Sequence, residues 1–157
     1  MTSQVEQRLA ALGLALPPDW TPRGQFLPFR KDGNTVYLSG QICEWAGAVT
    51  HAGPVADTPE GIQSGREAAQ ICALNLLYRL REACHGDLDR VDVVLRLGGF
   101  VNCQSGFGAS PAVINGATEL FIALFGASGW HARTAVGVPG LPGNASVEVD
   151  AIVRLKD

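Results

Sequence analysis

The chain has 157 residues, of which 46% are hydrophobic and 17% are charged, and its formal net charge at pH 7 is −3. This length is sufficient for one domain with a sizeable apolar core, and the low share of charged residues indicates that partner subunits cover some apolar surface. The acidic balance and the lack of a basic run argue against a dedicated binder of nucleic acid or of an anionic membrane surface.

The sequence pattern disfavours several further classes of protein. The N-terminal segment lacks the cationic start and apolar stretch of a signal peptide. No run approaches the ~18 consecutive apolar residues that indicate a membrane span. The four cysteines form no Cys-x-x-Cys pair, which is typical of reduced thiols in the cytoplasm. The three histidines show no metal-ligand spacing, so we expect no metal.

The N-terminal part of the chain predicts a helix followed by a hairpin. Residues 3–13 place apolar side chains at helical spacing, with Ser3 as the N-cap. The connector LPPDWTPRG follows, and its prolines exclude a helix. Strands are expected over residues 25–30 and 35–41, because the segment KDGN between them carries the Asp-Gly signature of a tight hairpin turn.

The clearest predicted element is a long helix in the middle of the chain. It begins with Asp57 or Thr58 as the N-cap and Pro59 in its first turn. It continues to about Cys84 and ends before Gly86. Such a helix has about 26 residues and a length of ~39 Å, which is enough to lie across a sheet.

Three elements are predicted for the second half of the chain. Residues 90–102 form a strand rich in valine and leucine, and a helix follows with Ser110 as its N-cap, Pro111 in its first position and Phe125 near its end. Residues 131–153 alternate apolar and other side chains on both sides of a Pro/Gly-rich turn. This pattern is typical of a β-hairpin.

The order of elements is helix, strand, strand, helix, strand, helix, strand, strand. This order predicts an α+β fold, with a single mixed β-sheet and two helices packed on one face of it. No internal repeat or low-complexity segment interrupts the chain, so we expect one domain over residues 1–157.

One arginine in the final predicted hairpin stands out. Alternation places Arg133, Ala135 and Gly137 on one strand face, and the two small neighbours leave space beside the guanidinium. One hypothesis is a structural ion pair with Glu148, which the turn could bring close to Arg133. The other is that Arg133 binds the carboxylate of a ligand, since a guanidinium offers parallel N–H donors that match a carboxylate.

Three further polar residues lie near these elements. Ser39 ends a strand within SGQI, Asn115 lies in the first half of a helix, and His131 lies two residues before Arg133. From the residues alone, each also fits a structural role: a strand end, a half-exposed helix position and a surface histidine.

Four segments together resemble a known family. They are GNTVYLSGQI, GDLDRVDVVLRLGGFVN, INGATELF and, most specifically, ARTAVGVPGLPGNASVEVDAI. The chain is similar to the YjgF/RidA family of reactive-intermediate (enamine/imine) deaminases, also called the L-PSP endoribonuclease family. The similarity extends from about Gly24 to Arg154, and the helix over residues 3–13 resembles a longer subgroup of that family.

The resemblance implies a chorismate-mutase-like fold and a homotrimer. Three sheets would line a barrel, with the helices outside and a ligand cleft between each pair of subunits. It also assigns roles in binding a small carboxylate or imine. Arg133 matches the carboxylate-binding arginine and Glu148 matches the glutamate that positions a water. The residues expected to line the cleft are Ser39, Asn115, Ala135, Phe26 and His131.

Three of these positions depart from the family pattern. Phe26 stands where many active members have a tyrosine, Ala135 where they often have a cysteine, and His131 where a proline is common. A backbone contact survives the change from cysteine to alanine. The loss of the tyrosine hydroxyl removes a polar contact.

The implied reaction is hydrolysis of an imine such as 2-iminopropanoate to a 2-oxo acid and ammonia. It needs no cofactor and no covalent nucleophile, because Arg133 would hold the substrate and Glu148 would orient the water. The alternative is a non-catalytic binder or sensor of small carboxylic acids, which would use the same arginine. RNA cleavage, which one family name implies, is disfavoured by the acidic composition.

Overall fold

The computed structural model describes residues 3–18 and 24–157 of the chain. Part of the expected proline-rich connector, residues 19–23, lies outside the described residues. The helices and strands are, in chain order, α1 (Gln4–Ala11), β1 (Phe29–Asp32), β2 (Thr35–Ile42), β3 (Glu44–Trp45), β4 (Ala48–Val49), α2 (Pro59–Ala83), β5 (Val91–Asn102), α3 (Ser110–Phe125), β6 (Ala132–Val138) and β7 (Val147–Leu155). Short 3₁₀ turns precede β5 and follow α3, and a third lies between β6 and β7.

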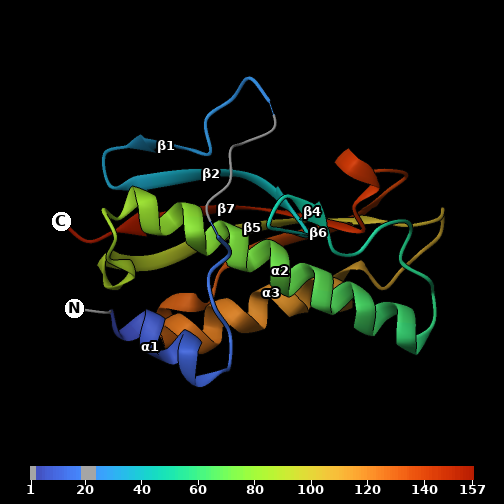
Figure 1. The fold of residues 1–157 in the computed structure, drawn as a ribbon, viewed down its shortest axis with the longest axis horizontal. Helices are drawn as coiled ribbons and strands as arrows, with labels where there is room; N and C mark the ends of the chain where they lie inside the picture. The colour runs from blue at the N-terminus through green and yellow to red at the C-terminus, as the bar shows by residue number, and fades with distance from the viewer. Residues whose placement is uncertain (1–2, 19–23) are drawn as a thin grey trace.

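A five-stranded mixed sheet forms the body of the molecule, with the strand order β1-β2-β7-β5-β6. β5 and β6 are parallel and the other neighbours are antiparallel. The helices α2 and α3 lie side by side over one face of the sheet (Figure 1). This confirms the predicted mixed sheet with two helices on one face. β3 and β4 form a separate two-stranded sheet that the sequence did not predict.

The helix boundaries follow the predicted capping signals, with one exception. Ser3 and Glu6 form a reciprocal capping box at α1, and the Thr58 side chain accepts a hydrogen bond from the backbone N–H of Gly61 at α2. Ser110 is not the N-cap of α3, because it is already the first helical residue and its hydroxyl is buried without a hydrogen-bond partner. Ala109 occupies the cap position.

The predicted C-terminal hairpin is wrong. Both of its strands exist, but β5 lies between them, so that Leu97 pairs with Arg133 on one side and with Ala151 on the other. Alternation and turn residues identify strands without identifying their partners. β7 carries apolar residues that are buried at every second position, which suits a central strand, whereas β6 is a sheet edge.

The first strand also differs from its predicted position. It was expected over residues 25–30 and is found at Phe29–Asp32, while its turn to β2 lies where the Asp-Gly signature predicted it. Gly33 adopts a φ of 55° in that turn, a conformation that glycine adopts without steric cost. Phe26 therefore lies in the segment that precedes the sheet.

The core fills the space between the sheet and the helices. β7 contributes Val147, Val149, Ala151 and Val153 to it, all of them almost fully buried. The helices approach each other closely at Gly116, where an added Cβ would collide with the backbone of Arg66 in α2. A glycine is a poor helix former, so its presence in α3 is explained by this contact.

The helix α3 is unusually apolar. With the turn that follows it, residues 110–129 are the one helical stretch in the described part of the chain that is long and apolar enough to cross a membrane. In this fold α3 packs against α2, β5 and β6. The stretch is therefore accounted for as the core helix of the domain.

Candidate active site

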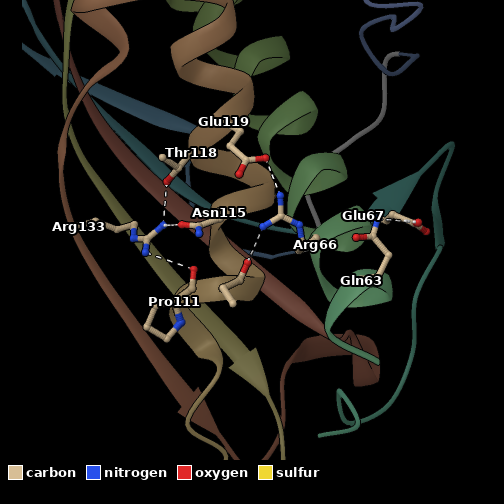
Figure 2. Close-up of polar contacts among 9 residues, drawn as sticks. Gln63, Arg66, Glu67, Pro111, Asn115, Thr118, Glu119 and Arg133 are labelled. Carbon is tan, nitrogen blue, oxygen red and sulfur yellow. Dashed lines mark hydrogen bonds and ion pairs between the residues drawn. The ribbon is translucent and has the colours of Figure 1, made fainter. Parts of the chain in front are cut away.

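Arg133 lies on the edge strand β6 with its side chain against α3 (Figure 2). Its Nη1 donates hydrogen bonds to Asn115 Oδ1 (2.8 Å) and Thr118 Oγ1 (3.0 Å), and its Nη2 donates to the carbonyl oxygen of Pro111 (3.3 Å). The three acceptors follow one stripe of the helix, at spacings of about one and two turns. They leave part of the guanidinium's hydrogen-bonding capacity unused.

Two small residues, Ala135 and Gly137, follow Arg133 along β6. Ala135 lies on the same strand face, partly buried against the core. At Gly137, an added Cβ would crowd the Cys103 sulfur. Their small side chains leave the space beside the guanidinium free, and α3 supplies the acceptors there.

The hypothesis of an ion pair between Arg133 and Glu148 is wrong for a single chain. Glu148 lies on β7, on the strand face opposite Val147 and Val149, which are buried under the helices. Arg133 lies on the helix side and on the other flank of β5. The two side chains therefore point away from each other across the sheet.

Glu148 lies at a cavity of about 200 Å³. Phe26, Gly40 and Gln41 are among the other residues that line it. Gly40 leaves room for the carboxylate, because a Cβ there would collide with Glu148. Burial raises the pKa of Glu148 above its usual value, and the nearby negative charge of Asp150 acts in the same direction.

Ser39 holds the segment that carries Phe26. Its hydroxyl donates a 2.6 Å hydrogen bond to the carbonyl oxygen of Leu27, and its backbone N–H donates to the carbonyl oxygen of Pro28. Phe26 itself is 51% exposed. Two of the residues predicted from the sequence are thus linked through this short segment, beside the cavity that contains Glu148.

His131 joins the Arg133 cluster from the turn that precedes β6. Its Nε2 lies 3.0 Å from Thr118 Oγ1 and its Nδ1 lies 2.6 Å from the carbonyl oxygen of Gly129. Burial lowers the pKa of His131, and the charge of Arg133 acts in the same direction while the Gly129 bond opposes it. His131 is half-buried and hydrogen-bonded, which differs from a free surface histidine.

The predicted site residues therefore form two groups. The arginine group consists of Arg133, Asn115, His131 and Ala135, on β6, α3 and the turn between them. The glutamate group consists of Glu148 and Phe26, which line the cavity beside β2, and Ser39, which holds the segment that carries Phe26. Within one chain, the structure brings together the members of each group but does not bring the two groups together.

Sequence reasoning missed Thr118 and Gly40. Thr118 lies three residues after Asn115, a spacing that places both on one helix face, and this signal could have found it. Gly40 was visible within SGQI, but its closeness to Glu148 depends on the pairing of β2 with β7. Within the described residues, no cluster of three or more His, Cys, Asp or Glu side chains could hold a metal ion.

Comparison with known proteins identifies relatives over almost the whole chain. A family model described as "YjgF/chorismate mutase-like, putative endoribonuclease" matches residues 6–155. Protein TCP17 from Trypanosoma cruzi is 36% identical over 159 aligned positions, which cover 99% of this chain and 97% of that protein.

Two solved structures are similar in both sequence and fold. The protein Atu1372 from Agrobacterium tumefaciens, described as having unknown function, is 40% identical with a TM-score of 0.87, covering 96% of this chain and 91% of that one. A "putative endoribonuclease" from Shewanella oneidensis is 30% identical with a TM-score of 0.89, covering 96% and 99%.

Proposed function

The chain belongs to the YjgF/chorismate mutase-like family, and we propose that it is a cytoplasmic hydrolytic deaminase of 2-imino acids such as 2-iminopropanoate. The products are a 2-oxo acid and ammonia. The observation that carries this proposal is the arginine held on α3 by Asn115, Thr118 and Pro111, with hydrogen-bonding capacity left over. Such a group suits a small carboxylate ligand.

Arg133 binds the substrate carboxylate in this proposal. A guanidinium makes two parallel hydrogen bonds to a carboxylate and thereby fixes its orientation as well as its position. The contacts to α3 hold the guanidinium before the ligand arrives, which reduces the entropic cost of binding. The imine carbon C2 then lies at a fixed position relative to the guanidinium.

Glu148 acts as the general base. The substrate reacts as the protonated imine: a water oxygen bonds to C2, Glu148 takes one proton from that water, and the C=N π electrons move to the nitrogen, which becomes a neutral amine on a tetrahedral carbon. Glu148 then gives this proton to the amine. The C2 hydroxyl returns its proton to Glu148 as the C=O bond forms, the C–N bond breaks, ammonia leaves, and Glu148 finally loses the proton to solvent. The raised pKa of Glu148 supports this role, because a base with a pKa nearer neutrality accepts a proton more readily.

The ligand site lies between subunits of a homotrimer in this proposal. The arginine and glutamate groups point away from each other within one chain, so a ligand that contacts both needs the glutamate group of a neighbouring subunit. The sheet face opposite the helices exposes apolar side chains, including Tyr37 (47% exposed) and Val136 (41% exposed). A partner subunit over this face would cover them.

Ammonia release tests the proposed function. The substrate 2-iminopropanoate is generated in the assay from alanine by an amino-acid oxidase, and its disappearance is followed with and without the protein. We expect faster ammonia release with the wild type and the uncatalysed rate with Arg133→Ala. Saturable binding of 2-oxo acids without any acceleration would contradict the deaminase and favour the alternative, a non-catalytic binder of small carboxylic acids. Cleavage of RNA without imine hydrolysis would contradict both.

A further inference from the structure

We propose that Thr118 and His131 are positioning residues for Arg133: His131 orients the Thr118 hydroxyl so that its oxygen faces the guanidinium. The link to ligand binding rests on the proposed function, but the hydrogen bonds among these residues are present in the ligand-free chain. The four groups form one continuous series, from the Gly129 carbonyl through His131 and Thr118 to Arg133.

The hydrogen-bond roles along this series are fixed by chemistry. A backbone carbonyl can only accept, so His131 Nδ1, 2.6 Å from the Gly129 oxygen, carries the proton. In the neutral imidazole the other nitrogen is then bare and accepts. Thr118 Oγ1 lies 3.0 Å from that Nε2, so the hydroxyl donates its proton to His131. The lone pairs of the oxygen remain for Arg133 Nη1, also at 3.0 Å.

This arrangement fixes the plane of the guanidinium. Nη1 has two N–H groups, and they donate to two different residues of α3, Asn115 and Thr118. With only the Asn115 bond, the planar group could turn about that contact. The second acceptor prevents the turn, and the N–H groups left over are held in one orientation for a carboxylate.

His131 is needed because a threonine hydroxyl inside a helix has a competing acceptor. It can donate to the backbone carbonyl one turn earlier, on its own helix, as well as to His131. When the hydroxyl donates to His131, it no longer donates to that carbonyl, and its oxygen keeps one orientation. His131 therefore acts on Arg133 through Thr118 and does not contact the guanidinium itself, so its effect requires the Thr118 hydroxyl.

The test compares three single variants with the wild type. Thr118→Val keeps the shape and removes the hydroxyl, Thr118→Ser keeps the hydroxyl, and His131→Phe removes the acceptor. Thr134→Val is the matched control, because it makes the same substitution on the opposite face of β6, away from α3 and the guanidinium. Light scattering checks that every variant has the mass of the wild-type assembly.

The first measurement is made without ligand. Nitrogen-15 NMR of labelled arginine reports how fast the Arg133 guanidinium rotates. We expect slow rotation in the wild type, Thr118→Ser and Thr134→Val, and faster rotation in Thr118→Val and His131→Phe. The imidazole spectrum should show the tautomer with the proton on Nδ1. Equal rotation rates in Thr118→Val and Thr134→Val, or a proton on Nε2, would overturn the proposal.

The second measurement is affinity for 2-oxobutanoate by calorimetry. We expect Thr118→Val to weaken binding by about three- to tenfold and Thr118→Ser to restore it to within about twofold of the wild type. The double variant His131→Phe/Thr118→Val should bind no more weakly than Thr118→Val alone, because His131 acts through the hydroxyl. Additive losses, or no rescue by serine, would overturn the proposal. If the wild type bound no 2-oxo acid, the proposed function would fail and the rotation rates would still decide the positioning role.

Discussion

Single residues explain why an arginine stands in a strand of small apolar residues. Arg133 and the small residues Ala135 and Gly137 share one strand face, and α3 packs against this strand and supplies Asn115, Thr118 and Pro111 as acceptors. Alternation placed Arg133 and its small neighbours on one strand face and left two hypotheses for its partner, Glu148 or a ligand carboxylate. Within the chain, the structure places the partners of Arg133 on α3 and not at Glu148, because alternation identifies a strand face but not the element packed on it.

Substitution of Arg133 tests its role in binding. We expect Arg133→Ala to weaken binding of pyruvate or 2-oxobutanoate by at least about tenfold to a hundredfold, since a hydrogen bond to a charged group contributes roughly 1.5–3 kcal/mol. Arg133→Lys should recover only part of this, because an ammonium cannot make the two-pronged contact. Calorimetry gives the affinities. Unchanged affinity with a large fall in melting temperature would show that Arg133 only joins β6 to α3.

Substitution of Glu148 separates catalysis from binding. Glu148→Gln keeps the shape of the side chain and removes the base, so imine hydrolysis should fall by about a hundredfold or more while 2-oxo acid affinity stays nearly constant. Stopped assays of ammonia and calorimetry on the same preparation measure the two effects. A collapse of binding together with loss of the assembly would instead identify Glu148 as a structural residue.

The raised pKa of Glu148 predicts the direction of the pH dependence. The base must be ionised to accept a proton, so kcat should be constant at high pH and fall as the pH decreases through the pKa of Glu148. Because burial and Asp150 raise this pKa, the fall should begin at a higher pH than for an ordinary glutamate. A rate profile between pH 4 and 8, corrected for spontaneous hydrolysis, shows whether it does.

At the scale of elements, local signals predicted the helices better than the strand pairing. Capping residues and glycines act within a few positions along the chain, so α1 and α2 begin and end close to where the sequence placed them. Ser110 is not the cap because α3 already begins at Ser110, whereas an N-cap residue precedes the first helical residue. Strand partners depend on contacts distant in sequence, which is why the insertion of β5 between β6 and β7 was missed.

The close approach of α2 and α3 depends on Gly116. In an exposed helix, a change from glycine to alanine stabilises by about 1 kcal/mol, but here the new methyl group would meet the backbone of Arg66. We therefore expect Gly116→Ala to lower the free energy of unfolding by roughly 1–3 kcal/mol, measured by denaturant titration. Gly108→Ala, at a position with open space around it, is the control. Stabilisation by Gly116→Ala would contradict the observed helix contact.

At the scale of the whole molecule, a single chain holds the arginine group and the glutamate group apart, although the proposed reaction needs both at one ligand. The family resemblance predicted the fold and the residues of both groups, and the family and fold are confirmed. The homotrimer and the site between subunits stay predictions. A single sequence contains no direct signal for which surfaces of two copies meet, although the exposed apolar side chains of the sheet indicate that some surface is covered.

The most direct test of a site shared between subunits mixes two inactive variants. Arg133→Ala and Glu148→Gln are purified separately, unfolded and refolded together, with each variant refolded alone as the control. Light scattering checks that the mixture has three times the chain mass of 16.5 kDa. If Arg133 and Glu148 of one site come from different subunits, about a quarter of the sites in an even mixture carry both native residues. Ammonia release should then recover to about a quarter of the wild-type rate, whereas a mixture as inactive as either variant alone would contradict the shared site.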